Sequence, residues 1–262
     1  SCAMQEIEFK FQVPVKKRKA LQKAFTLLKA EPIHLAAQYF DTADQTLAKH
    51  CIAIRRRQEN DEWKQTFKAV DTTKALGRFE LEFDIEPPET TTLDLDNYKK
   101  DYSAIYKKLK RALGLPLPTL ELLFETKIQR LRVLQDVGSI TVEIALDIGK
   151  IFKEQSSVDI FEIEFELKQG SIEDLIAFIQ AWIQKYQLSL DTHSKSDYGL
   201  QAVRQQSYFP AQYQTPLVLN RSSSEVEALQ NILANCLQHL LPNASSIARQ
   251  QYLSLIHISE PT

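Results

Sequence analysis

The sequence predicts an α+β fold in which helices pack against an antiparallel sheet. Several segments alternate charged with apolar residues, as in Glu6-Ile7-Glu8-Phe9-Lys10, and this is the period of a strand with one wet and one apolar face. Stretches with helical periodicity lie between these segments. About eight strands are expected, and antiparallel pairing can join most of them.

Four helices are expected between the strands, and each has a start or stop signal or an apolar stripe. Pro14 favours the first turn of the first helix, Gly114 ends the third, and Ser171 with Asp174 starts the fourth. The second is a short turn of helix. The expected ranges are residues 15–29, 43–50, 97–113 and 171–187.

Charged residues recur at alternate positions in one strand after another. A single strand of this kind usually just faces solvent, but the repetition favours a sheet with one face lined by charges of both signs. The alternating residues after the first strand are Arg55, Arg57, Lys64, Lys68, Arg78, Glu80, Glu82, Glu143, Asp147, Glu162, Glu164 and Glu166.

The composition indicates a globular protein with no membrane and no nucleic-acid partner. The 262 residues are 44% hydrophobic and 25% charged, with a formal net charge of −2. No global basic field attracts nucleic acid, and no apolar run reaches the ~20 residues of a membrane span. The N-terminus lacks a signal-peptide core, so a cytoplasmic location is predicted. The three cysteines lack CxxC spacing, which argues against a zinc site or a disulfide framework.

The charged segments resemble motifs of the CYTH superfamily, the triphosphate tunnel metalloenzymes. Glu6-x-Glu8-x-Lys10 matches the ExExK hallmark, and later segments follow in the family's order within about residues 4–204. These are Tyr39-Phe40-Asp41-Thr42 and residues 52–57, 63–68, 78–82, 142–149, 161–168 and 194–196. The resemblance is closest to the bacterial inorganic triphosphatases. It implies a closed antiparallel barrel, the triphosphate tunnel, with helices packed outside.

The resemblance implies metal-dependent hydrolysis of inorganic triphosphate to pyrophosphate and phosphate. Arginine and lysine bind phosphate, and carboxylates hold hard cations. The expected substrate contacts are Lys10, Arg55, Arg57, Lys64, Lys68, Arg78, Lys127, Arg130 and Lys195. The expected ligands of two Mg²⁺ or Mn²⁺ ions are Glu6, Glu8, Glu80, Glu82, Asp147, Glu162 and Glu164. Glu6, Glu8 and Lys10 are the expected catalytic residues.

Two details of this set are open to test. Lys127 and Arg130 differ by an odd number, so a regular strand points them to opposite faces and only one is expected to reach the site. Carboxylates crowded together repel one another, so replacing Glu8 or Glu164 by glutamine is predicted to leave the fold intact and even to raise its stability.

Two other functions compete with inorganic triphosphatase. One is another CYTH activity, thiamine triphosphatase or class IV adenylate cyclase, which needs room for an organic group. The other is a non-catalytic module that binds polyphosphate. The predicted partners are therefore inorganic triphosphate and longer polyphosphate.

The ends of the chain are predicted to lie outside the CYTH domain of residues 4–204. Residues 1–3 are interpreted as a tag scar before Met4, and residues 205–222 as a linker. Residues 223–252 resemble the start of a truncated CHAD domain, and their orphan helix is predicted to pair two copies into a homodimer. Residues 253–262 resemble a translated sequencing adapter.

Overall fold

The computed structural model describes residues 7–71, 77–191, 195 and 198–200. Glu6, the side chain of Arg78, the predicted linker, the CHAD-like helix and both terminal segments lie outside the described part. No helix within the described part is both long enough and apolar enough to cross a membrane.

The predicted α+β class is confirmed, because helices flank a single antiparallel sheet. Eight longer strands are joined by two strands of two residues each. The strands are β1 Ile7–Gln12, β2 Glu31–Asp41, β3 Ile52–Glu59, β4 Glu62–Asp71, β5 Gly77–Ile85, β6 Thr92–Leu93, β7 Leu120–Val137, β8 Ile140–Lys153, β9 Ser156–Gln169 and β10 Ser189–Leu190.

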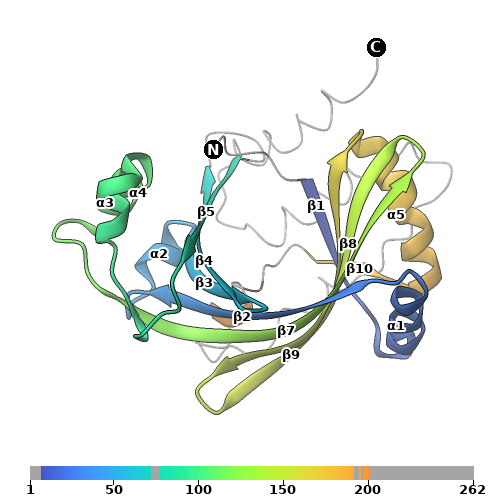
Figure 1. Cartoon of the computed structure of the whole chain (residues 1–262), viewed down its shortest axis with the longest axis horizontal. Coiled ribbons are helices and arrows are strands. Elements are labelled where there is room, and N and C mark those ends of the chain that lie inside the picture. Colours follow the sequence, from blue (N-terminus) through green and yellow to red (C-terminus); the bar gives the residue numbers. More distant parts are fainter. Residues whose placement is uncertain (1–6, 72–76, 192–194, 196–197, 201–262) are drawn as a thin grey trace.

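The sheet curls around one concave face. Its order is β10-β1-β9-β8-β7-β2-β3-β4-β5, with β6 added beside β7. In Figure 1 the β1 end and the β5 end rise on opposite sides, while β2 and β7 form the floor between them. A pairing that would join the two ends into a closed barrel is not among those of the described residues.

The helices lie close to their predicted ranges, with one difference. They are η1 Val15–Lys17, α1 Arg18–Leu27, α2 Thr46–Lys49, α3 Asp96–Asp101, α4 Ser103–Leu113 and α5 Ile172–Tyr186. The single helix expected at 97–113 is two helices, because Tyr102 leaves the helical region with φ −139° and ψ 70°. The Tyr102 ring stacks on Phe83 of β5, with centroids 5.1 Å apart, and this contact favours the break.

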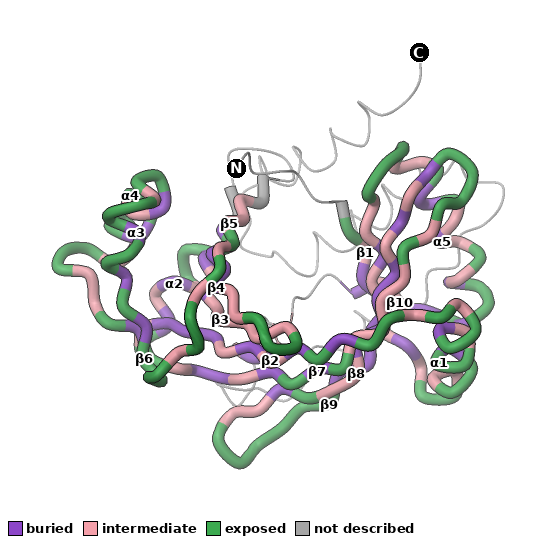
Figure 2. The backbone as a smooth tube through the Cα atoms, in the orientation of Figure 1, coloured by how far each residue is buried: buried purple, intermediate pink, exposed green. Residues whose placement is uncertain are grey.

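Two apolar cores hold the helices against the outer face of the sheet. Helices α1 and α5 pack on β1, β8 and β9, where Phe25 and Phe165 are fully buried. Helices α2 to α4 pack on β3 to β5 around Phe67 and Tyr98. Each such side chain contributes about 1.5–3 kcal/mol. Figure 2 shows exposed residues gathered at hairpin ends and on the outer sides of α1 and α5.

Tight hairpins fix the register that the charged face depends on. Glu59 pairs with Glu62, Val137 with Ile140, and Lys153 with Ser156, so each hairpin has a two-residue turn. The first turn residue has positive φ in all three: Asn60, Gly138 and Glu154. Such turns match the twist of the strands and prevent a one-residue slip that would turn every charge outward.

The floor of the concave face is apolar. Leu35, Ala37 and Ile128 are buried there, and Tyr198 and Leu200 pack against the same cluster. This floor lies between the two charged ends of the sheet.

Gly149 of β8 allows a close approach to β7. A Cβ at this position would lie 2.0 Å from the backbone oxygen of Lys127. Only glycine therefore fits where the two strands come together.

Candidate active site

Strand register brings the charged residues onto one face. Thr66 of β4 lies opposite Arg55 of β3 and Glu82 of β5. At the other end of the sheet, Glu162 of β9 lies opposite Asp147 of β8 and Gln12 of β1. Directly opposite residues project to the same side of an antiparallel pair. The charges of the outer strands therefore share the concave face.

Three carboxylates converge at one end of this face. Asp147, Glu162 and Glu164 each offer an oxygen within 4.8 Å of the other two. Asp147 is 0% exposed and Glu162 is 1% exposed. We call these three residues the carboxylate cluster.

Three basic side chains neutralise the carboxylate cluster. Lys195 Nζ lies 2.7 Å from Asp147 Oδ2 and 3.2 Å from Glu164 Oε1, and it also donates to Glu162 Oε1. Arg130 donates to both oxygens of Asp147 at 2.7 Å. Arg130 also lies 3.3 Å from Glu164. Lys10 Nζ lies 3.3 Å from Glu162 Oε2.

The pKa shifts follow from this pairing. Burial alone would raise the pKa of Asp147, but Lys195 and Arg130 hold it well below its usual range. Burial alone would lower the pKa of Lys195, but the three carboxylates raise it well above the ordinary value. Asp147 and Lys195 are therefore both charged at neutral pH.

Asp191 is a further buried carboxylate that the sequence analysis missed. Its Oδ2 accepts hydrogen bonds from Gln12 Nε2 and from the Tyr198 hydroxyl, both at 2.6 Å. The same oxygen lies 3.9 Å from Lys10 Nζ, and the Asp191 amide donates to the Lys10 carbonyl. Asp191 thus holds the Lys10 backbone and side chain in place. The only sequence signal was its position four residues before Lys195.

The other end of the face carries an excess of basic side chains. Arg57 and Lys64 each lie 3.6 Å from Glu82, and Lys68 lies 3.5 Å from Glu80. We call these five residues and Arg55 the basic half, and we call the carboxylate cluster with Lys10, Arg130 and Lys195 the carboxylate half.

The basic half has more basic than acidic side chains and is suited to bind an anion. Partial removal from water and the charge of Arg55 lower the pKa values of both Arg57 and Lys68. Among the described side chains, the buried Nε atoms of Arg55 and Arg57 have no hydrogen-bond acceptor. Arg55 Nη1 donates a hydrogen bond to the Tyr39 hydroxyl at 3.4 Å. Burial alone would raise the pKa of this phenol, but the charge and hydrogen bond of Arg55 lower it.

The two halves face each other across the concave space. Glu8 of β1 is far from Lys68 of β4 in strand order, yet its charge acts to raise the pKa of Lys68. Glu8 acts in the same way on Arg130, whose pKa lies far above its usual range because Asp147 outweighs burial. A ligand on the floor would therefore meet carboxylates on one side and cations on the other.

The predicted site residues fall into three groups: those on the charged face, those outside the described part of the chain, and Lys127 on the opposite face. The charged face brings together Glu8, Lys10, Arg55, Arg57, Lys64, Lys68, Glu80, Glu82, Arg130, Asp147, Glu162, Glu164 and, through its ion pairs, Lys195. Glu80 and Glu82 lie on this face but pair with basic residues, outside the carboxylate cluster. Glu6 and the Arg78 side chain lie outside the described part of the chain.

Lys127 lies on the wrong face for a substrate contact. It pairs in register with Ala36 and Lys150, and its ammonium lies 5.6 Å from the Phe152 ring centroid. Arg130, three residues later, is the member of the pair that reaches the charged face. The expectation that Lys127 contacts substrate is therefore corrected.

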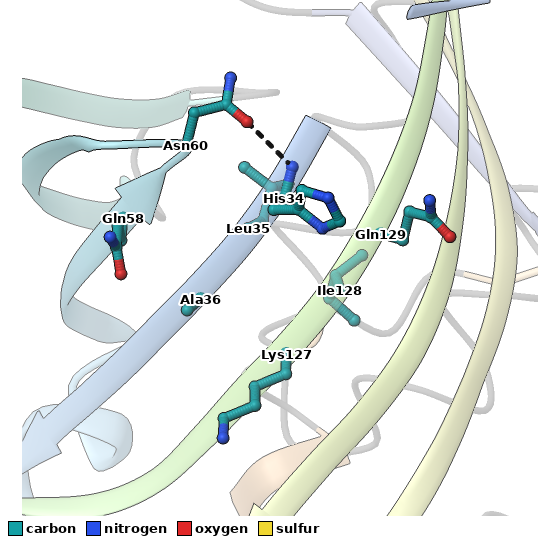
Figure 3. A pocket seen from close by; sticks show the side chains of 8 residues that line it. All are labelled: His34, Leu35, Ala36, Gln58, Asn60, Lys127, Ile128 and Gln129. Carbon is teal, nitrogen blue, oxygen red and sulfur yellow. Dashed lines mark hydrogen bonds between the residues drawn. The ribbon is translucent and has the colours of Figure 1, made fainter. Parts of the chain in front are cut away.

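Lys127 instead lines a groove of about 410 Å³ formed by β2, β3 and β7. Figure 3 shows Lys127 and Gln129 on one wall and Gln58 and Asn60 on another, with Asn60 accepting from the His34 amide at 3.3 Å. The groove is lined by His34, Leu35, Ala36, Gln58, Asn60, Lys127, Ile128 and Gln129. It has no carboxylate, so it offers no acidic ligands for a hard cation.

The carboxylate cluster fits a hard divalent cation. Its three ligand groups come from two rigid strands, β8 and β9, and all are carboxylates. Mg²⁺ and Mn²⁺ prefer such oxygen ligands. A bound ion would have to share or replace the position of Lys195 Nζ.

Comparison with known proteins identifies the family. Residues 4–198 match the family described as the CYTH domain, and this is most of the chain. The chain belongs to the CYTH family. The resemblance of its charged strands to that family is thereby confirmed, whereas the CHAD resemblance stays a prediction.

A named relative is similar in sequence over most of this chain. The chain is 30% identical over 202 residues to a Haemophilus influenzae protein named inorganic triphosphatase. The match covers 75% of this chain and 54% of that protein, so the chain spans about half the length of its relative.

Two solved structures have the same fold. A candidate adenylate cyclase from Bacillus halodurans is 20% identical, with a TM-score of 0.52 over 74% of this chain and 96% of that one. A candidate adenylyl cyclase from Hippeastrum, described as having a dominant triphosphatase activity, is 19% identical, with a TM-score of 0.52 over 78% and 98%. At these identities the likeness concerns the fold alone.

Proposed function

We propose that this CYTH chain hydrolyses inorganic triphosphate to pyrophosphate and phosphate with Mg²⁺ or Mn²⁺. The observation that carries the proposal is the opposition of a carboxylate half and a basic half on one concave face. A polyanion that needs a metal ion requires both kinds of group at once. The relative from Haemophilus influenzae supports the choice of substrate.

In this proposal the basic half binds and straightens the phosphate chain. Arg55 and Arg57 have buried Nε atoms with no acceptor, so phosphate oxygens would satisfy donors that are otherwise left unpaired. Lys64 and Lys68 add charge on the next strand. Lys10 and Arg130, at the edge of the carboxylate cluster, would hold the phosphate nearest the metal.

The carboxylate cluster would hold the metal. A divalent ion bound there would neutralise phosphate oxygens and lower the pKa of a coordinated water. Glu8 is our candidate for orienting the attacking water, because it lies two residues before Lys10 on β1 and therefore shares the charged face with it. Asp191 would act as a positioning residue through Lys10.

A substrate panel with metal tests the proposal. We expect phosphate release from triphosphate with Mg²⁺ or Mn²⁺, loss of release in excess EDTA, and much lower rates on ATP and thiamine triphosphate. Glu164→Gln should abolish most turnover, whereas Lys127→Ala, on the opposite face, should leave it unchanged. Undiminished hydrolysis in EDTA would refute a metal-dependent site.

The same panel separates the alternatives. Formation of cyclic AMP from ATP would indicate a cyclase, and faster release from thiamine triphosphate would indicate a thiamine triphosphatase. Binding of polyphosphate without turnover would indicate a binding module. A cytoplasmic location, and a homodimer formed through residues 223–252, remain proposals that fractionation and light scattering can test.

A further inference from the structure

The ammonium group of Lys195 stands where a metal ion would be expected. It contacts all three residues of the carboxylate cluster: Asp147 at 2.7 Å, Glu164 at 3.2 Å, and Glu162 through a hydrogen bond. An ammonium has three N–H donors, and three carboxylates can use all of them. In this arrangement Lys195 has no donor left for a phosphate.

The charge balance shows what a metal ion would meet. The three carboxylates of the cluster carry −3 and Lys10, Arg130 and Lys195 together carry +3, so these six side chains are formally neutral; Asp191, 3.9 Å from Lys10, adds one negative charge at their edge. A divalent ion gains little from a neutral group unless one cation leaves. Within the carboxylate cluster, Arg130 contacts Asp147 and Glu164, and Lys10 contacts Glu162. Lys195 is the cation that contacts all three.

Lys195 is also the cation best placed to move. Lys10 and Arg130 project from strands of the sheet. β1, which carries Lys10, pairs with β9 and β10, and β7, which carries Arg130, pairs with β2 and β8. Lys195 comes after β10, has helical backbone and belongs to no strand of the sheet. Its ammonium can therefore shift without disturbing the ladder that holds the carboxylates.

We propose that Lys195 is a built-in counter-ion of the metal site, displaced by the divalent cation and then available to donate to a phosphate of the substrate. The inference rests on the proposed function for the identity of the anion. It implies that metal and triphosphate bind cooperatively, because the displaced ammonium needs an anionic partner. By linkage, each ligand then raises the affinity of the other by the same factor.

Manganese binding measures this directly, without turnover. Free Mn²⁺ can be followed by electron paramagnetic resonance in the wild-type chain, in Lys195→Met, and in Lys64→Met, which removes the same charge from the same face but outside the cluster. Without phosphate, we expect Lys195→Met to bind Mn²⁺ at least tenfold more tightly than the wild type, and Lys64→Met to resemble the wild type.

A nitrogen-bridged triphosphate that resists hydrolysis tests the coupling. It should raise the Mn²⁺ affinity of the wild-type chain at least tenfold and that of Lys195→Met far less. Equal or weaker Mn²⁺ binding by folded Lys195→Met would overturn the inference, because Lys195 would then be a fixed part of the site.

A measurement on the wild-type chain keeps the inference falsifiable if Lys195→Met does not fold. The ¹⁵Nζ resonance of Lys195 should shift when diamagnetic Mg²⁺ and the triphosphate analogue are added together. An unchanged resonance in the metal-bound protein would also overturn the inference. Both readouts are independent of hydrolysis, so a chain that proves inactive on triphosphate can still confirm the displacement by Mn²⁺.

Discussion

The carboxylate half and the basic half of the concave face carry similar residue types but are built differently. In the carboxylate half Asp147 is entirely buried and lies 2.7 Å from both Arg130 and Lys195. In the basic half the pairs lie at 3.5–3.6 Å, and Lys68 is 47% exposed. One half is dry and tightly paired, while the other is wetter and loosely paired.

This difference teaches how each half can bind its ligand. A tight, neutral cluster can accept a cation only by giving one up, because buried charges must stay paired. Loose pairs near solvent contribute little to stability, so an anion can replace a carboxylate partner at small cost. The carboxylate half is therefore suited to exchange of ions, and the basic half to direct capture of a polyanion.

The largest expected effect is on stability in the carboxylate half. Asp147→Asn leaves Arg130 and Lys195 without the carboxylate that both contact, and breaking a buried pair in this way typically costs about 3–5 kcal/mol. Urea unfolding in metal-free buffer measures the loss. Asp159 and Lys150 form an exposed ion pair and provide the control. Asp159→Asn should lower the free energy of unfolding by less than about 1 kcal/mol.

Acid unfolding gives a second readout of the same pair. Because the folded protein holds the pKa of Asp147 below its ordinary value of 3.8, the stability that this carboxylate adds is complete above that value. It is lost as the pH falls through the acid range below it. Asp147→Asn should therefore flatten the decline of stability in that range. An unchanged acid profile would mean that Asp147 is not paired as the structure has it.

The sequence predicted the charged face well, because alternation fixes which residues share a side. Arg55 with Arg57, Lys64 with Lys68, and the glutamates of β9 all lie where the period of two puts them. The odd spacing of Lys127 and Arg130 also predicted that only one would reach the face. Spacing could not tell which one, since that depends on the register with β2 and β8.

The sequence could not predict which side chains from distant segments come into contact. The prediction that removing a carboxylate relieves repulsion overlooked Lys195, Arg130 and Lys10, which come from three separate segments to neutralise the cluster. Asp191 was missed for the same reason, because only the fold brings it beside Lys10. The break of the predicted helix at Tyr102 depends on a stacked ring from β5, again a tertiary contact.

The next effect in size is on substrate binding in the basic half. Arg57→Ala should raise KM for triphosphate about tenfold to hundredfold with a smaller change in kcat, because a hydrogen bond between charged groups contributes about 1.5–3 kcal/mol. Steady-state phosphate release measures both constants. The neighbouring Arg56 faces the other way, with its guanidinium over the Phe40 ring, so Arg56→Ala is the matched control.

An unchanged KM in Arg57→Ala would contradict the division into two halves. If Arg56→Ala raised KM as much, the effect would belong to the stability of β3 rather than to the charged face. Thermal unfolding of both variants separates these outcomes, because both lose the same side-chain type from the same strand.

The smallest expected effect is the sharpest test of where the two halves divide. Glu82 accepts from Thr66 Oγ1 at 3.1 Å and lies 3.6 Å from Arg57 and from Lys64. The charge of Arg57 and the Thr66 hydrogen bond lower the pKa of Glu82 although burial opposes them, so it is a counter-ion in the unliganded face.

Glu82→Gln should change the free energy of unfolding by less than about 1 kcal/mol. It should also lower KM a few-fold, because it frees Arg57 and Lys64 for phosphate, and it should leave Mn²⁺ affinity unchanged. Glu164→Gln, the same substitution in the carboxylate half, should weaken Mn²⁺ binding strongly. If Glu82→Gln weakens Mn²⁺ binding as much, then Glu82 is a metal ligand as the sequence predicted, and the metal site extends across both halves.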